Sequence, residues 1–213
     1  MVKRIIFDLD NTLIPWDKKW DIAVKETLDE FGIQYDLKSL EEYQDAIVEY
    51  EMKEKRYSID RLTDFLSNYI GISLPKEFFE RWIEKLSVLV PPKDEKLISM
   101  LDRLSKKYSL VVATNWFKSQ QVSKLKLCGL LDYFDEVITG EDFDIKPNSD
   151  MFNYYKKGYD DSEVVMVGDS YLTDIKGANN ANIHAYFITN SDEYTSNNEY
   201  TVIKDIYELE KYL

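Results

Sequence analysis

Two carboxylates near the start of the chain have the types and spacing that chemistry needs. Asp8 and Asp10 end a short run of strand-forming residues and are separated by one residue. Successive side chains of a strand point to opposite faces, so both carboxylates are expected on one side, at the strand's carboxyl end, where open α/β sheets keep their sites. The two negative charges repel each other unless a cation lies between them. Mg²⁺, a hard cation that prefers oxygen ligands, is the expected partner.

Three later segments place further polar groups beyond expected strands. Thr114 and Asn115 follow one apolar run, Lys146 stands just ahead of an expected helix, and Asp169 follows another apolar run with Asp174 five residues later. A parallel sheet would gather these groups beside the first two carboxylates. Phosphoryl transfer uses such a set: a carboxylate nucleophile, a second carboxylate as acid and base, and cations that offset the charge of the phosphate.

The elements that must position these residues alternate between strands and helices. Apolar stripes at helical spacing separate the last four of five β-like runs, which predicts a parallel sheet with right-handed crossovers. The polar stretch 190–201 predicts a surface loop, and residues 203–213 predict a closing helix. The five β-like runs are 4–8, 110–114, 136–139, 164–168 and 184–188.

A long insertion separates the first two expected strands. Residues 15–90 carry four apolar stripes at helical spacing, which predicts a small helical bundle. Prolines at both ends suit rigid hinges. We therefore expect an α/β core made of residues 1–14 and 91–213, with an inserted helical cap at 15–90. Trp16 and Trp116 are expected near the cleft between the two parts, as candidates for the substrate pocket.

Taken together, the polar segments resemble the four motifs of the haloacid dehalogenase-like hydrolase superfamily, in the subgroup with a helical cap after the first strand. The resemblance covers the core, whereas the cap matches only in position and helicity. It implies a Rossmann-like parallel sheet. The motifs, in chain order, are Asp8-Leu9-Asp10-Asn11-Thr12-Leu13, then Thr114-Asn115, then Lys146-Pro147, then Gly168-Asp169-Ser170-Tyr171-Leu172-Thr173-Asp174.

The resemblance implies a Mg²⁺-dependent phosphatase that works through an aspartyl-phosphate. Asp8 would be the nucleophile, and Asp10 would be the general acid and then the general base. Mg²⁺ would be held by Asp8, by the backbone carbonyl of Asp10 and by Asp169.

The same resemblance assigns roles to four further residues. Thr114 and Lys146 would bind the transferring phosphoryl group, with Asn115 helping near the substrate. Asp174 would lie next to the metal ligands or pair with Lys146. The substrate would be a small phosphorylated metabolite, whose identity the sequence does not specify.

Three other functions stay open at this point. A phosphotransferase or mutase would use the same intermediate and differ only in what the cap admits. A 2-haloacid dehalogenase is disfavoured, because a departing halide needs no acid at Asp10. A non-catalytic interaction protein is disfavoured, because the complete set of catalytic side chains is present.

Composition narrows the class of protein further. The 213-residue chain is 44% hydrophobic, which suits a packed core, and its net charge of −13 argues against general nucleic-acid binding. No apolar run reaches membrane-spanning length and no signal-peptide region is recognisable, so a cytoplasmic protein is expected. With His184 as its single histidine and Cys128 as its single cysteine, the chain cannot form a multi-histidine zinc site or an internal disulfide. The oligomeric state is not indicated.

Overall fold

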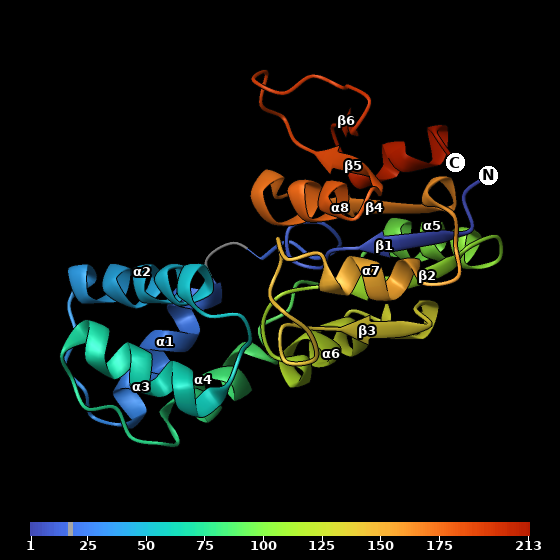
Figure 1. Ribbon diagram of the computed structural model, residues 1–213. Coiled ribbons are helices and arrows are strands. Elements are labelled where there is room, and N and C mark those ends of the chain that lie inside the picture. The colour runs from blue at the N-terminus through green and yellow to red at the C-terminus, as the bar shows by residue number, and fades with distance from the viewer. Residues whose placement is uncertain (17–18) are drawn as a thin grey trace.

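The computed structural model describes residues 1–16 and 19–213, which form a parallel sheet, its covering helices and a separate helical layer (Figure 1). The sheet has six strands in the order β3-β2-β1-β4-β5-β6, and each neighbouring pair is parallel. The predicted α/β, Rossmann-like fold is therefore confirmed. The strands are β1 (Arg4–Phe7), β2 (Ser109–Ala113), β3 (Glu136–Ile138), β4 (Val164–Gly168), β5 (His184–Ile188) and β6 (Tyr200–Ile203).

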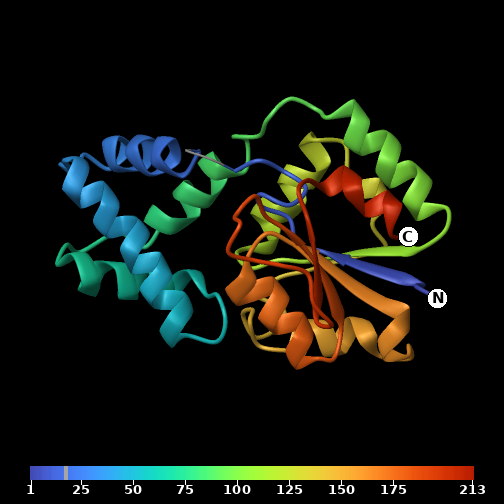
Figure 2. The same ribbon diagram turned by 90° about the horizontal axis from the view of Figure 1, so that it is seen from above.

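Both faces of the sheet are covered, which explains why its strands are almost continuously apolar. In β1, Ile5 and Phe7 pack on one side with residues of α5 and α6, whereas Ile6 packs on the other side with residues of α7 and α8. Figure 2 shows these helices on opposite sides of the sheet. The covering helices are α5 (Glu95–Ser105), α6 (Lys118–Leu127), α7 (Asp150–Lys156) and α8 (Lys176–Asn180).

The C-terminal end differs from the prediction. The five predicted runs each coincide with a strand, but residues 200–203, placed at the boundary between a loop and a helix, form the edge strand β6 beside β5. The segment that follows is a short 3-10 helix, Ile206–Lys211, whose N-terminus is capped by the Asp205 carboxylate. The predicted loop is thus confirmed only as far as residue 199, and the predicted closing helix is a 3-10 helix that starts three residues later than expected. The strand between them was missed because its residues alternate little between apolar and polar and follow a polar stretch.

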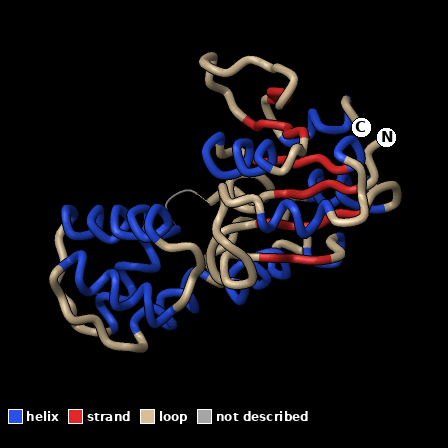
Figure 3. Tube along the Cα trace, in the orientation of Figure 1, coloured by secondary structure: helices blue, strands red, loops and turns tan. Residues whose placement is uncertain are grey.

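The described residues of the inserted segment form four helices, in agreement with its four apolar stripes. They are drawn apart from the strands in Figure 3 and pack around Trp82, Tyr43 and Phe78. Trp116 and Phe117, which follow β2, join the same apolar cluster and tie this layer to the sheet. The helices of this layer are α1 (Lys19–Glu30), α2 (Leu37–Lys53), α3 (Ile59–Ile70) and α4 (Phe78–Leu86). Among the described residues, no helix is both long and apolar enough to cross a membrane.

Candidate active site

The site begins where three parallel strands end. β1 pairs with β2 and β4 so that Phe7 lies opposite both Val112 and Val167, which brings the residues after each strand to one edge. A cavity of about 590 Å³ opens at this edge. The structure brings to it all nine residues singled out in the sequence: Asp8, Asp10, Trp16, Thr114, Asn115, Trp116, Lys146, Asp169 and Asp174.

Lys146 occupies the buried centre of the site. Its Nζ lies 2.5 Å from Asp8 Oδ1 and 2.6 Å from Asp174 Oδ1, and all three side chains are at least nine-tenths buried. Burial disfavours the ammonium, but Asp174 and Asp8 outweigh that effect and raise the pKa of Lys146, so it stays protonated. Gly168 at the end of β4 allows this packing, because a Cβ there would lie 2.4 Å from Asp174 Oδ2.

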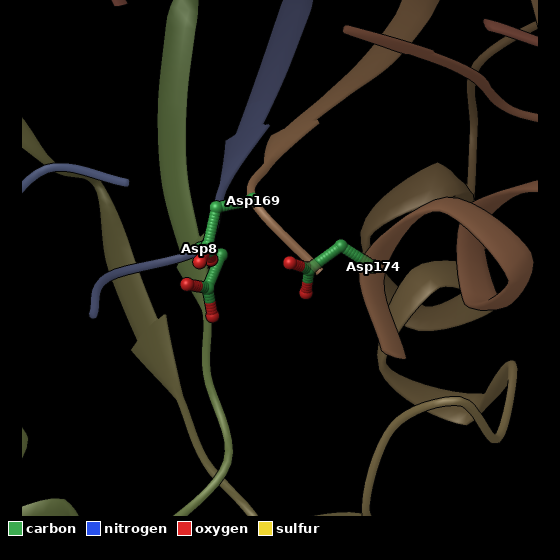
Figure 4. A group of neighbouring side chains, drawn as sticks. All are labelled: Asp8, Asp169 and Asp174. Carbon is green, nitrogen blue, oxygen red and sulfur yellow. The ribbon is translucent and has the colours of Figure 1, made fainter. Parts of the chain in front are cut away.

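Three carboxylates surround this single ammonium. Figure 4 shows the side chains of Asp8, Asp169 and Asp174 gathered at the ends of the strands. One oxygen of each lies within 4.8 Å of those of the other two. Burial raises the pKa of Asp8, Lys146 opposes the rise, and the charges of Asp174 and Asp169 add to it. Burial and the charge of Asp174 also raise the pKa of Asp169 to about 6. The cluster thus has an excess of negative charge, and its all-oxygen donor set fits a hard divalent cation.

The Asp10 carboxylate turns away from this cluster and toward α6. It accepts hydrogen bonds from Lys124 Nζ and from Gln121 Nε2, the latter at 2.9 Å. Lys124 is fully buried, with its Nζ 3.8 Å from the ring centroid of Trp16. Asp10 is therefore held by two side chains of one helix, and its own carboxylate is not part of the three-carboxylate cluster.

Sequence reasoning missed Gln121 and Lys124. The apolar stripe of α6 is visible in Val122, Leu125 and Cys128, but no role was predicted for the polar residues beside it. One signal was available: α6 starts soon after β2 ends, so polar residues on its inward face must lie near the sheet edge and its carboxylates.

Thr114 and Asn115 follow each other in the chain but have different hydrogen-bond partners in the site. The Thr114 hydroxyl lines the cavity and accepts a 3.0 Å hydrogen bond from Gln121 Nε2. Asn115 Oδ1 accepts a hydrogen bond from the backbone N–H of Lys146 at 2.9 Å, and its Nδ2 donates to the Lys146 carbonyl at 3.4 Å. Asn115 thereby fixes the loop that carries the central lysine.

The two candidate pocket tryptophans both line the cavity, from different elements. The Trp16 backbone N–H donates to Asn11 Oδ1 at 2.9 Å, so the loop after β1 sets its position. Trp116 has a φ of +84°, a left-handed conformation that a bulky residue rarely adopts. Its ring lies 5.2 Å from that of Trp20 and 5.2 Å from that of Tyr57. Local strain at Trp116 is therefore held by packing against the helical layer.

A strand-end carboxylate cluster around a buried lysine, below an inserted helical layer, defines a class of α/β hydrolase. The sequence profile of the family described as haloacid dehalogenase-like hydrolase matches residues 5–188. The chain belongs to this family. The predicted family membership is thus confirmed, while the individual residue roles stay predictions.

Two curated proteins and one solved structure are similar to this chain over most of its length. The ribulose-1,5-bisphosphate 5-phosphatase of Halopiger xanaduensis is 30% identical, covering 91% of this chain and 87% of the relative. The pyrimidine 5'-nucleotidase PynA of Streptococcus pneumoniae is 26% identical, and the match covers 85% of this chain and 81% of the relative. The crystal structure of an HAD phosphatase from Thermococcus onnurineus matches with a TM-score of 0.68 and 32% identity, covering 99% of this chain and 97% of that one.

Proposed function

We propose that the protein is a Mg²⁺-dependent phosphatase that hydrolyses a small phosphorylated metabolite through an aspartyl-phosphate on Asp8. The observation that carries this proposal is the buried Asp8–Lys146–Asp174 arrangement, with Asp169 beside it at the end of the sheet. A carboxylate at this position is a nucleophile whose repulsion with phosphate is offset by the neighbouring ammonium. The relatives described above are named as phosphatases and a nucleotidase, which supports the same activity.

The reaction takes two steps in this proposal. An oxygen of Asp8 attacks phosphorus, the bond from phosphorus to the leaving oxygen breaks, and Asp10 donates its proton to that oxygen. Water then attacks the phosphorus of the aspartyl-phosphate, Asp10 takes a proton from the water, and the bond between phosphorus and Asp8 breaks. Lys146 and Thr114 bind the phosphoryl oxygens throughout. Both residues line the same cavity as the two aspartates.

The carboxylates of this site suit Mg²⁺. Asp8, Asp169 and the backbone carbonyl of Asp10 would hold the ion, with Asp174 beside it and paired with Lys146. When bound, Mg²⁺ neutralises negative charge on the phosphoryl group and on its nucleophile. The negative excess among the described carboxylates is the property of this chain that supports a cation here.

We also propose that residues 15–90 act as the cap of this site and residues 1–14 and 91–213 as its core. The helical layer contributes Trp20, Asp21 and Glu51 to the cavity wall, so it can select the leaving group and exclude water. Its loop after α2 is tied to the loop before Lys146 by a 2.9 Å hydrogen bond from Tyr57 N–H to the Gly140 carbonyl.

Phosphate release tests the proposal. The wild type and Asp8→Asn would be assayed with Mg²⁺ on nucleotides, sugar phosphates, phosphoglycolate and an aryl phosphate, with exposed Asp132→Asn as the matched control. We expect turnover of at least one ester by the wild type and the control, none by Asp8→Asn, and none in EDTA. Equal rates for Asp8→Asn and the wild type, or no turnover of any ester, would contradict the proposal.

The two curated relatives are named for different substrates, a sugar bisphosphate and pyrimidine nucleotides. Because the two names differ, they do not identify the leaving group of the substrate of this chain. The wall of its own cavity is therefore the place to look for the substrate class.

A further inference from the structure

The cavity has an outer wall that none of the proposed catalytic groups belongs to. We use this name for six lining side chains beyond the sheet edge. They come from the loop after β1, from α1, α2 and α6, and from the turn after β2, and they are Trp16, Trp20, Asp21, Glu51, Trp116 and Gln120. Three tryptophans make this wall largely flat and apolar, so its few polar groups decide what it recognises.

Gln120 is the most informative of these polar groups. Its side chain is 1% exposed and lines the cavity, yet neither its Nε2 nor its Oε1 has a hydrogen-bond partner among the described residues. Its neighbour Gln121 is equally buried, and its Oε1 also lacks a partner among the described residues, but its Nε2 lies within 3.0 Å of oxygens of Asp10, Thr114 and Asn115. Buried amides without partners are unfavourable and uncommon, so Gln120 is suited to a bound group that offers one acceptor and one donor.

Trp20 adds a second donor of the same kind. Its Nε1 is buried and also lacks a partner among the described residues, and its ring packs 5.2 Å from that of Trp116. The indole N–H can only donate. Two residues that line the cavity thus have donor nitrogens without a partner among the described residues, and Gln120 also has an acceptor oxygen without one.

The charges of the outer wall exclude one kind of ligand. Its ionisable members among the described side chains are the carboxyl groups of Asp21 and Glu51, and no lysine or arginine faces them across this wall. The two lysines near the site are paired elsewhere, Lys146 with Asp8 and Asp174, and Lys124 with Asp10. Among the described side chains, a carboxylate or a second phosphate on the leaving group would therefore meet the carboxyl groups of Asp21 and Glu51, while the nearest lysine of the cavity, Lys146, is already paired with two carboxylates.

We propose that the site selects phosphate esters whose leaving group is uncharged and carries a hydrogen-bond donor next to an acceptor, and that Gln120 reads this pair. This inference rests on the proposed phosphatase function and adds the substrate class to it. Two sources present such chemistry: the amide-like edge of a pyrimidine base in a nucleoside monophosphate, and neighbouring hydroxyl groups in a sugar phosphate. Gln120 is a specificity residue in this account, and Asp8 and Asp10 remain the catalytic residues.

Matched esters test the charge rule in the wild-type protein with Mg²⁺. Glycerol 3-phosphate and 3-phosphoglycerate differ by a hydroxymethyl group against a carboxylate, and we expect kcat/KM to favour the uncharged ester by about tenfold or more. Uridine 5'-monophosphate and ribose 5-phosphate separate the two sources, because only the first has a base edge. A higher kcat/KM for uridine 5'-monophosphate assigns the base, and a higher value for ribose 5-phosphate assigns the hydroxyl groups.

Variants of Gln120 test the recognition itself. Gln120→Leu keeps much of the volume and removes both hydrogen bonds, so kcat/KM for the best uncharged ester should fall about 10- to 100-fold more than for 4-nitrophenyl phosphate, which has no such pair. Gln120→Glu keeps the shape of the side chain and should also lower the ratio of kcat/KM for the best uncharged ester to kcat/KM for 4-nitrophenyl phosphate. This variant replaces the leucine variant if the latter does not fold. Exposed Gln34→Leu is the matched control and should leave the ratio unchanged.

Two results would overturn the inference while leaving the phosphatase standing. One is a preference of the wild type for 3-phosphoglycerate or for a bisphosphate. The other is hydrolysis of 4-nitrophenyl phosphate with an ester ranking that neither Gln120 variant changes. If the wild type hydrolyses none of these esters, including 4-nitrophenyl phosphate, the proposed function fails, and this inference fails with it.

Discussion

The sheet edge and the outer wall of the cavity differ in how far their buried polar groups are paired within the protein. At the sheet edge, Lys146 is paired with two carboxylates and Asp10 is held by Lys124 and Gln121. In the outer wall, buried polar atoms of Gln120 and Trp20 have no partner among the described residues. The difference separates two tasks. The charged groups of the proposed chemistry have protein partners before a ligand arrives, whereas the Gln120 amide and the Trp20 indole keep donors that a ligand can satisfy. Gln121 Oε1, which also has no partner among the described residues, is an exception at the sheet edge.

Removing the central ammonium should have the largest effect. Lys146→Met leaves Asp8 and Asp174 buried without their shared cation, which should abolish phosphate release and, in EDTA, lower the free energy of unfolding by about 3–5 kcal/mol. Urea unfolding measures the second effect. Lys118→Met, which breaks an exposed ion pair with Asp142, is the control and should cost less than about 1 kcal/mol. Equal stability of the two variants would mean that the sheet edge is not organised by its charges.

Loosening Asp10 should have the next largest effect. Lys124→Met removes a buried partner of the proposed general acid, so kcat should fall about 100-fold, with a smaller change in KM. The loss should be greater for an alkyl ester than for 4-nitrophenyl phosphate, because a good leaving group needs less protonation. Lys126→Met, an exposed position on the same helix, is the control. An equal loss on both esters would indicate a structural role only.

The backbone strain at Trp116, a residue of the outer wall, can be tested by substitution. Because its φ is +84°, Trp116→Gly should be more stable than Trp116→Ala by about 1 kcal/mol, as glycine accepts this conformation and alanine does not. The order should reverse at exposed Ser99 within α5, where alanine should be better than glycine by about the same amount. Thermal unfolding of the four variants measures both differences. The same order at both positions would show that position 116 is not strained.

The smallest expected effect concerns charge in the outer wall. Asp21→Asn should raise kcat/KM for 3-phosphoglycerate relative to glycerol 3-phosphate by about two- to fivefold, since Asp21 is exposed and solvent screens its charge. Asp45→Asn, an exposed position on α2, serves as the control and should leave the ratio unchanged. If Asp21→Asn leaves the ratio unchanged as well, the outer wall does not discriminate through Asp21.

The sequence predicted the sheet edge well because strand periodicity and parallel pairing leave few choices. Once 4–8, 110–114 and 164–168 are read as parallel strands, Asp8, Thr114 and Asp169 must meet at one edge. The outer wall was harder to predict, because it depends on how α1, α2 and α6 pack against each other. A buried Gln120 and a left-handed Trp116 are properties of tertiary packing, and nothing in the local pattern distinguishes them from an ordinary helix residue and an ordinary turn residue.

Trapping the intermediate tests the central claim most directly. The protein would be mixed with Mg²⁺ and its best ester, quenched in acid within one turnover, and digested for mass spectrometry of the peptide that contains Asp8. The account predicts that this peptide gains the mass of one phosphoryl group in the wild type, and that Asp8→Asn gains none and releases no phosphate. A phosphoryl group on a different residue, or phosphate release by Asp8→Asn at the wild-type rate, would contradict it.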